Sequence, residues 1–383
     1  MRALIVEHGG SRAALAAARA LRSTGWEVGL GAPARRPPAA YSRAVGRWHH
    51  VPPSSDRGPF LSAVAAAIAE GGYELVLGAD DADMIALAEG GEGLGATVAH
   101  PSPPVIRRAL DKLQLTAAAR EVGVAVPRTW SDADRWPQAV DGPLVVKARE
   151  HAPAGSELSR IEVVRATTRS EAQSQAASIR ERGGEPFFQE LVDGRLEAFV
   201  GVTDTRHSLV ASSYQVATGT YPPALGRSTR ARVVAVEPAV EDAVERLLAR
   251  LEWTGIVELQ FVRSEGGPPK LLDLNGRIYG SLELTVAAGL NLPDLWVRIA
   301  TGRPLPSSRA VTRVGTRYQW LEGDLRRALA ERRHGLIRDV AGTFAYGVGA
   351  HHSMMSLSDP LPAITMAAML AQRAVRRSLG RRH

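Results

Sequence analysis

The sequence predicts an α/β protein with an α+β central part and a mostly helical, basic end. The first hundred or so residues alternate short apolar runs with alanine-rich helical stretches, which is typical of an open, mostly parallel sheet. Further along, apolar runs come in pairs joined by short polar turns, which favours antiparallel strands. Beyond residue 305, arginine dominates the charged residues.

The first region opens as a βαβ unit. We expect strands over residues 3–6 and 25–30 with a helix between them, followed by a helix over 60–70 and a strand over 75–77. Prolines at 101, 103 and 104 end the region, so we predict a domain over residues 1–104.

Polar residues follow two of these strands. His8 comes after the first strand, and Asp80 and Asp81 come after the strand at 75–77. Because open α/β sheets bind ligands at the carboxyl ends of their strands, these residues are candidates for the edge of a binding site.

The central part mixes helices and strands. The helices are predicted at 105–122, 170–182 and 238–251, and the strands at 143–147, 161–164, 187–192, 195–202, 255–262 and 270–274. Residues 148–160 are expected to form a loop.

Composition excludes several classes of protein. At 383 residues, 45% apolar and 23% charged, the chain can bury more than one core, so two or three domains are expected. The sequence contains no cysteine, which excludes disulfides, thiolate metal sites and a cysteine nucleophile. The apolar run near the N-terminus is too short for a signal peptide, so we expect a cytoplasmic protein.

The net charge of +7 is unevenly distributed. Residues 303–383 contain 14 arginines and five acidic residues, whereas residues 1–302 carry a net charge of −2. The high isoelectric point therefore belongs to the end of the chain, and the body gives no reason to expect nucleic acid as a partner.

Lysine is scarce: only Lys112, Lys147 and Lys270 stand among 47 basic residues. A compact ammonium can enter a phosphate cluster that a planar guanidinium would crowd. Lys112 opens a predicted helix, and Lys147 ends a predicted buried strand. Chance survival of three lysines is the alternative.

Asp193 and Gly194 lie between two apolar runs, which predicts a two-residue hairpin. In that hairpin Glu190 and Glu197 would face each other, and opposed carboxylates need a shared donor. The amino group of a purine and ribose hydroxyls would supply donors; two solvated surface glutamates are the alternative.

A second strand pair carries hard oxygen ligands. Asp273 and Asn275 are two residues apart on one strand and share a face, and the preceding strand brings Glu258 alongside them. Such a set suits Mg²⁺, which takes few carboxylates and leaves room for phosphate oxygens.

Taken in order, these segments resemble the ATP-grasp superfamily from about residue 100 to residue 300. The matching residues are Asp111-Lys112, the segment 123–127, the strand ending at Lys147, Gln189-Glu190-Leu191-Val192 with Glu197, the segment 255–258, and Asp273-Leu274-Asn275-Gly276-Arg277. Residues 275–281 and 287–293 look most like predicted carboxylate–amine ligases, whose relatives include carbamoyl-phosphate synthase-like proteins.

The resemblance implies a Rossmann-like pre-ATP-grasp domain, a small lobe at 105–184, a large lobe at 185–305 and a C-terminal extension at 306–383. It also implies that Lys112 and Lys147 neutralise the phosphates of ATP. Glu190 and the backbone of Leu191 and Val192 would read adenine, and Glu197 would hold the ribose.

The resemblance further implies two Mg²⁺ ions, or Mn²⁺ in their place, held by Glu258, Asp273 and Asn275, with Arg277 stabilising the transferred phosphoryl group. Residues 148–160 would cover the phosphates. The sequence departs from the family pattern at Gly276, where proline is frequent, and at Asp273, where glutamate is usual. The 148–160 loop holds one glycine, Gly155.

The implied activity is that of an ATP-dependent ligase that phosphorylates a carboxylate and transfers the acyl group to an amine. A carboxylase, a ligase using a non-amine nucleophile, and a non-catalytic ATP-binding protein are the alternatives. Arg227, Arg230 and Ser281 are candidates for holding the carboxylate and amine substrates.

The C-terminal segment 361–383 joins an apolar stretch to five arginines. A packed helix with a basic end is favoured over contact with an anionic membrane surface. A homo-oligomer remains compatible with the sequence.

Overall fold

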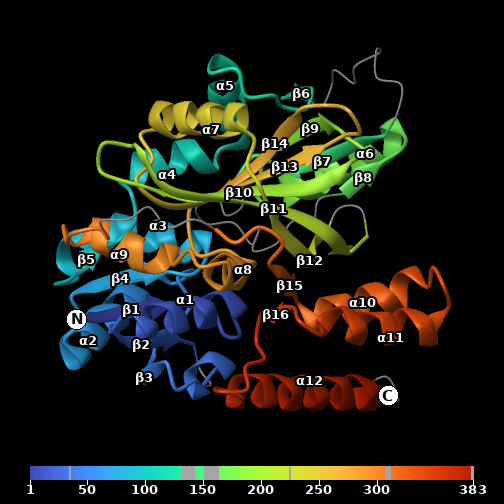
Figure 1. Ribbon diagram of the computed structural model, residues 1–383. Coiled ribbons are helices and arrows are strands. Elements are labelled where there is room, and N and C mark those ends of the chain that lie inside the picture. Colours follow the sequence, from blue (N-terminus) through green and yellow to red (C-terminus); the bar gives the residue numbers. More distant parts are fainter. Residues whose placement is uncertain (34–35, 132–142, 151–163, 224–225, 307–311, 381–383) are drawn as a thin grey trace.

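Three β-sheets organise the described part of the chain (Figure 1). The computed structural model describes residues 1–33, 36–131, 143–150, 164–223, 226–306 and 312–380, with side chains described as far as residue 372. The predicted α/β class with an α+β central part is confirmed.

The first sheet is parallel, with strands in the order β3-β2-β1-β4-β5. Its strands are β1 (Arg2–Val6), β2 (Glu27–Ala32), β3 (Val45–His50), β4 (Leu75–Gly78) and β5 (Thr97–Val98). The order reverses between β1 and β4, so the connections leave opposite faces of the sheet there. His8 follows β1, and Asp80 and Asp81 follow β4, at this switch point.

Helices flank the parallel sheet. They are α1 (Arg12–Ser23), α2 (Arg57–Gly71) and α3 (Asp81–Gly90), with short 3₁₀ turns η1 (Pro38–Tyr41) and η2 (Gly91–Gly93). The hydroxyl of Ser11 accepts the Ala14 N–H and begins α1, and the Asp80 carboxylate accepts the Asp83 N–H and begins α3.

A four-stranded antiparallel sheet has the order β6-β9-β7-β8. Its strands are β6 (Thr129–Trp130), β7 (Leu144–Ala148), β8 (Val164–Ala166) and β9 (Pro186–Glu190). Helix α6 (Arg169–Glu181) packs on it and begins at a capping box formed by Thr168 and Glu171. Alternate residues of β7, Leu144 and Val146, face the small core shared with this helix.

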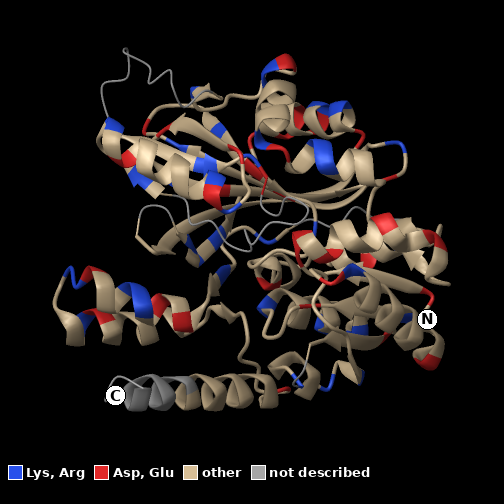
Figure 2. Ribbon diagram, turned by 180° about the vertical axis from the view of Figure 1, so that it is seen from behind, with Lys and Arg blue, Asp and Glu red and all other residues tan. Residues whose placement is uncertain are grey.

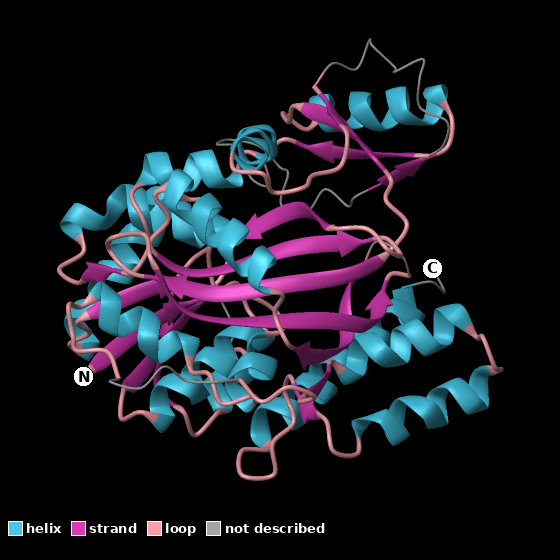
Figure 3. Cartoon of the chain, turned by 45° about the horizontal axis from the view of Figure 1, so that its top comes forward, coloured by secondary structure: helices cyan, strands magenta, loops and turns pink. Residues whose placement is uncertain are grey.

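The largest sheet has the order β14-β13-β10-β11-β12-β15-β16 and is antiparallel except for its last pair. Its strands are β10 (Arg195–Thr203), β11 (Leu209–Tyr221), β12 (Arg227–Val234), β13 (Gly255–Arg263), β14 (Pro269–Asn275), β15 (Arg317–Gln319) and β16 (His351–His352). Figure 3 shows its long strands running through the middle of the molecule, with the small sheet and its helix set apart.

The two faces of the largest sheet bury different helices. Phe199 and Leu259 pack under α4 (Pro103–Leu110), α5 (Lys112–Glu121) and α7 (Pro238–Leu251). Val200 and Ile256 point to the opposite face, where α8 (Leu282–Ala287) and α9 (Leu292–Ala300) lie.

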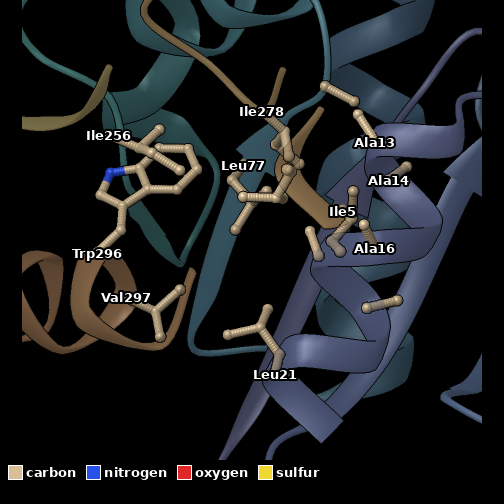
Figure 4. Packing of buried hydrophobic residues seen from close by; sticks show 14 of the residues in the cluster. Ile5, Ala13, Ala14, Ala16, Leu21, Leu77, Ile256, Ile278, Trp296 and Val297 are labelled. Carbon is tan, nitrogen blue, oxygen red and sulfur yellow. The ribbon is translucent and has the colours of Figure 1, made fainter. Parts of the chain in front are cut away.

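This second face joins the largest sheet to the parallel sheet in one core. Ile256, Ile278 and Trp296 pack with Ile5 and Leu77 of the parallel sheet (Figure 4). The Trp296 indole N–H donates to the Ala99 carbonyl at 2.7 Å, which satisfies its one polar atom inside this core. The carboxyl edge of the parallel sheet is therefore held against the largest sheet.

The predicted hairpin at Asp193-Gly194 is wrong. Strand β9 pairs with β6 and β7, whereas β10 pairs with β11 and β13 in the other sheet. Residues 191–194 connect the two sheets, so Glu190 and Glu197 do not face each other. Gly194 lies so close to β13 that a Cβ would approach the Arg263 carbonyl oxygen within 2.4 Å. The glycine thus permits the crossing rather than a turn.

The last part of the chain is mostly helical, as predicted, but it also completes the largest sheet. Helices α10 (Leu321–Glu331), α11 (Leu336–Gly347) and α12 (Leu361–Gly380) follow β15, which pairs with β12. The first half of α12 carries no charged side chain (Figure 2). The predicted basic residues from Arg373 onward lie outside the described side chains. Within the described residues, no helix is long and apolar enough to span a membrane.

Candidate active site

The hairpin of β13 and β14 brings together two of the predicted metal ligands. Glu258 lies directly opposite Asn275 in the antiparallel register. The Asn275 amide donates to Glu258 Oε2 at 2.8 Å, and the Gln260 amide donates to the same oxygen at 3.2 Å. Both predicted ligands are buried. Burial raises the pKa of Glu258, and the charge of Arg277 opposes that shift.

Asp273 lies two residues before Asn275 and opposite Gln260. Its negative charge contributes to the raised pKa of Glu258, and the same charge acts to raise the pKa of Lys147. The charge of Asp273 therefore acts both on a carboxylate of the largest sheet and on a cation of the small sheet.

Arg277 extends this network toward the parallel sheet. Its Nη2 donates to Asn275 Oδ1 at 3.0 Å, and its Nε lies 3.2 Å from Asp81 Oδ1. Gly276 is required because a Cβ there would lie 2.1 Å from the ring of the buried Trp253. Position 276, where proline is frequent in the superfamily, is thus occupied by glycine because the Trp253 ring leaves no room for a side chain.

The two lysines come from different elements, and the charges of Lys112 and Asp273 both act on Lys147. Lys112 begins α5, capped by Asp111, and Lys147 is the last residue but one of the buried strand β7. Lys147 Nζ donates to Gln189 Oε1 at 2.7 Å, whereas Lys112 Nζ is buried without a hydrogen-bond partner among the described residues. Burial lowers the pKa of Lys147 to about 8, and the charge of Lys112 adds to this shift.

Glu190 lies at the end of β9, just before the chain leaves the small sheet. It pairs with Lys270 Nζ at 2.6 Å and with Arg128 Nε at 2.7 Å. Burial acts to raise the pKa of Glu190, but these cations outweigh it and lower the pKa. Lys270, which had no predicted role, therefore holds this carboxylate. Leu191 and Val192 lie in the crossing between the sheets, and the Leu191 N–H donates to the Pro143 carbonyl at 3.3 Å.

Glu197 is buried on β10, and both of its carboxylate oxygens accept hydrogen bonds. Tyr214 donates its hydroxyl to Oε2 at 2.6 Å, Arg263 Nε lies 3.0 Å from the same oxygen, and Arg195 Nη2 lies 2.6 Å from Oε1. Burial acts to raise the pKa of Glu197, and the three hydrogen bonds outweigh it and lower the pKa. Its predicted contact with ribose stays a prediction.

Of the three predicted substrate residues, Ser281 lies beside the network. Its hydroxyl donates to Gln215 Oε1 at 2.8 Å and lies 3.5 Å from Glu258 Oε1. Arg230 instead forms an ion pair with the buried Asp324 of α10 at 2.7 Å and stacks on Tyr346. Arg227 begins β12. The substrate roles of all three stay predictions.

The predicted phosphate-covering loop at 148–160 lies largely outside the described residues. Only its beginning is described, where Arg149 pairs with Asp111 and with Glu185. Gly155 falls within the part that is not described.

Several polar residues of the site were not predicted. Gln189 and Gln260 bond the predicted groups Lys147 and Glu258 directly, and Asp83 lies one helical turn from Asp80. The alternation of the strands could have revealed Gln260, because it shares a face with Glu258. Asp83 follows the pair Asp80-Asp81 in the sequence, a spacing that places it in the first turn of a helix.

Comparison with known proteins identifies the class of fold. A family model described as "ATP-grasp in the biosynthetic pathway with Ter operon" matches residues 223–324. No curated protein matches the chain significantly.

Solved structures match over most of the chain. The biotin carboxylase domain of 2-oxoglutarate carboxylase from Hydrogenobacter thermophilus is 14% identical, with a TM-score of 0.63, covering 82% of this chain and 73% of that one. L-amino acid ligase from Bacillus licheniformis is 17% identical, with a TM-score of 0.60 and coverages of 80% and 75%. N5-carboxyaminoimidazole synthetase from Staphylococcus aureus is 12% identical, with a TM-score of 0.61 and coverages of 81% and 79%.

The protein has the ATP-grasp fold, which confirms the predicted superfamily. The structural matches include both a carboxylase and an amino acid ligase, so they do not separate these reactions.

Proposed function

We propose that this protein is an ATP-dependent ligase that activates a carboxylate as an acyl phosphate and transfers the acyl group to an amine. The observation that carries the proposal is the buried Lys112 ammonium, which has no hydrogen-bond partner among the described residues and stands near the equally buried Lys147. Two buried ammonium groups repel each other unless an anion lies between or beside them. A triphosphate is an anion of the required charge.

The donor set of the site fits Mg-ATP. Glu258, Asp273 and Asn275 offer hard oxygen ligands on adjacent strands, which suits Mg²⁺ bridging phosphate oxygens. The resident hydrogen bonds of Glu258 come from amides, which can rotate away when a cation binds. The fold also supports this proposal, since one structural match was solved with MgADP and bicarbonate.

In the proposed mechanism an oxygen of the carboxylate substrate attacks the γ-phosphorus of ATP, and ADP leaves. Lys112, Lys147 and Arg277 neutralise the phosphate oxygens and hold them in line for this attack. Bound Mg²⁺ supplies further neutralisation of charge on the phosphates.

In the second step the amine attacks the acyl carbon, inorganic phosphate leaves, and the nitrogen loses a proton. Arg277 is suited to hold the departing phosphate because its guanidinium is fixed by Asn275 and Asp81. Asp81 is thereby a positioning residue for Arg277.

Amide formation is favoured over carboxylation by the segment after Arg277. Residues 275–281 and 287–293 resemble predicted carboxylate–amine ligases, and an L-amino acid ligase matches the fold. The match to a biotin carboxylase domain supports carboxylation as the second candidate.

The test incubates the protein with Mg-ATP and a library of acid and amine pairs, and follows ADP and the mass of the product. A ligase of this kind releases ADP only with a matching pair and forms a product equal to acid plus amine less one water. Carboxylation would instead require bicarbonate and give a product heavier by carbon dioxide. Failure of the wild type to bind Mg-ATP, or equal binding by Lys147→Ala, would overturn the proposal.

A further inference from the structure

A second cluster of ligating side chains lies at the switch point of the parallel sheet. His8 follows β1, and Asp80 and Asp83 follow β4 at the start of α3. One imidazole nitrogen and one oxygen from each carboxylate all lie within 4.8 Å of one another. This is where the connections from adjacent parallel strands diverge, and open α/β sheets hold ligands there.

The two distances from His8 match the edges of a metal coordination shell. His8 Nε2 lies 2.8 Å from Asp80 Oδ2 and 3.3 Å from Asp83 Oδ1. Ligands about 2.0–2.2 Å from a divalent transition ion stand roughly 2.8–3.6 Å from one another, depending on the coordination geometry. An ion within bonding range of all three atoms therefore needs only small side-chain movements.

Asp83 is the least satisfied member of the cluster. Its side chain is 0% exposed, and neither of its oxygens has a well-formed hydrogen bond among the described residues, although the Ser54 hydroxyl acts to lower its pKa. Among the described residues, His8 lies 3.3 Å from Asp83 Oδ1 but closer to Asp80. A buried carboxylate without a donor costs several kcal/mol of stability unless a cation or a proton compensates it, on the order given by transfer data.

The chain builds this arrangement through local constraints. Asp80 Oδ1 accepts the Asp83 N–H at 3.0 Å, which leaves Asp80 Oδ2 directed at His8. Gly78 ends β4, and a Cβ there would lie 2.9 Å from the Asp83 Cβ, so the glycine permits the close approach of α3. The position of Asp83 is thus determined by the backbone.

We propose that His8, Asp80 and Asp83 bind a divalent transition-metal ion of the Zn²⁺ or Mn²⁺ class. An imidazole with two carboxylates suits these ions, whereas Mg²⁺ and Ca²⁺ prefer oxygen ligands alone. Half-exposed His8 and Asp80 leave the outer side of the ion open to solvent or to a donor atom of a ligand.

This site is distinct from the proposed Mg-ATP ligands and does not depend on the proposed ligase activity. The two regions are linked through Asp81, which neighbours Asp80 and pairs with Arg277, and the charges of Asp80 and Arg277 also act on each other. An ion at the switch point would therefore add positive charge beside a carboxylate that stabilises the Arg277 cation.

Zn²⁺ binding to the metal-free full chain, measured calorimetrically without nucleotide, tests the proposal. The wild type is expected to bind one Zn²⁺ that Asp83→Asn and His8→Ala each weaken by more than about tenfold. Mn²⁺ gives the same ranking by electron paramagnetic resonance. Asn has the shape of the protonated aspartic acid, so Asp83→Asn is expected to fold, which circular dichroism verifies.

Glu70→Gln is the matched control, because Glu70 forms a similar pair with His49 at 3.1 Å without a third ligand. It should bind Zn²⁺ like the wild type. The proposal is overturned if the wild type binds no Zn²⁺, or if Asp83→Asn binds it as tightly as Glu70→Gln does. Loss of binding in Asp273→Asn but not in Asp83→Asn would assign the ion to the Mg-ATP ligands instead, and also overturn it.

Discussion

Two buried carboxylates, Glu258 and Asp83, have different surroundings. Glu258 receives hydrogen bonds from the amides of Asn275 and Gln260, both on the same pair of strands. Asp83 has no well-formed hydrogen bond among the described residues, and His8 lies 3.3 Å from one of its oxygens. Both side chains belong to elements fixed by a shared core.

The difference indicates that the two carboxylates are compensated in different ways before a cation binds. Around Glu258, neutral amides hold the carboxylate in place and can give way to an ion with little loss, so the folded chain is stable without one. Around Asp83, the backbone brings the carboxyl group into the interior, and burial raises its pKa to about 8, so a proton or a cation must compensate its charge there. Substitutions of Glu258 and Asp83 test this contrast, and changes at Lys147 and Arg230 test other charges of the chain.

The largest effect is expected from Glu258→Gln. The substitution removes a charged oxygen ligand from the proposed Mg-ATP site, where such charge contributes several kcal/mol, so ATP turnover should fall by about 100-fold or more. Steady-state kinetics with a matching acid and amine pair measure it. Arg206→Lys is the control, because Arg206 is 85% exposed and its change should leave turnover as it is. Unchanged turnover in Glu258→Gln would remove Glu258 from the mechanism.

Lys147 should matter for affinity. A hydrogen bond to a charged group contributes about 1.5–3 kcal/mol, so Lys147→Ala should weaken Mg-ATP binding by roughly 10- to 100-fold. Lys147→Arg should also lose most of the affinity, because the ammonium is buried beside Gln189 and Lys112 and a guanidinium needs more room. Titration calorimetry distinguishes the cases. Wild-type affinity for Mg-ATP in Lys147→Arg would show that the site needs only a positive charge at this position and not an ammonium group.

Affinity for Mg-ATP should also depend on pH. Burial lowers the pKa of Lys147 to about 8 in the free chain, so the ammonium is lost as the pH rises through that value. Bound phosphate restores the proton, and the dissociation constant should therefore rise about fivefold between pH 8 and pH 9. The same titration on Lys147→Ala should lack this rise. A dependence shared by both proteins would have another origin.

Substitution of the two carboxylates should change the free energy of unfolding in opposite directions. In buffer with EDTA, Asp83→Asn should stabilise the chain by about 1 kcal/mol, because burial raises the pKa of Asp83 to about 8 and the neutral amide avoids that cost. Glu258→Gln should destabilise it by about as much, because a neutral amide oxygen accepts the hydrogen bonds of Asn275 and Gln260 less strongly and loses the attraction of Arg277. Urea unfolding followed by circular dichroism measures both. A loss of stability in Asp83→Asn would contradict the contrast drawn above.

Arg230 is expected to act on the fold. Its partner Asp324 is 0% exposed but also pairs with Arg327 and accepts a hydrogen bond from Gln319. Arg230→Met should therefore destabilise the fold by about 1–2 kcal/mol, less than the loss of every partner of a buried charge would. Thermal unfolding checks this. Full stability together with a raised KM for the carboxylate substrate would instead support the predicted substrate role.

Sequence patterns predicted contacts well where a short turn joined two alternating strands. Glu258 and Asn275 were expected side by side, and the register of β13 and β14 brings them together. The turn signal at Asp193-Gly194 was at least as strong, yet β9 and β10 each had other partners. Strand pairing is decided by the whole sheet, which a two-residue signal does not report.

Other features depended on distant parts of the chain. The contact between Arg277 and Asp81 joins residues far apart in sequence through packing of two sheets, and no local pattern indicates it. Strands β15 and β16 are too short to show alternation, so the completion of the largest sheet by the C-terminal segment could not be predicted. Both Lys270 and Glu190 could be singled out in the sequence, but their pairing could not be predicted.

We propose that the lysines and oxygen ligands hold Mg-ATP for acyl transfer to an amine. Nucleotide and product can be followed together in a mixture of acids and amines with excess Mg-ATP. We expect ADP, inorganic phosphate and a condensed product in equal amounts, all lost together in Glu258→Gln. Formation of AMP and pyrophosphate, or of ADP without a condensed product from any pair, would contradict it.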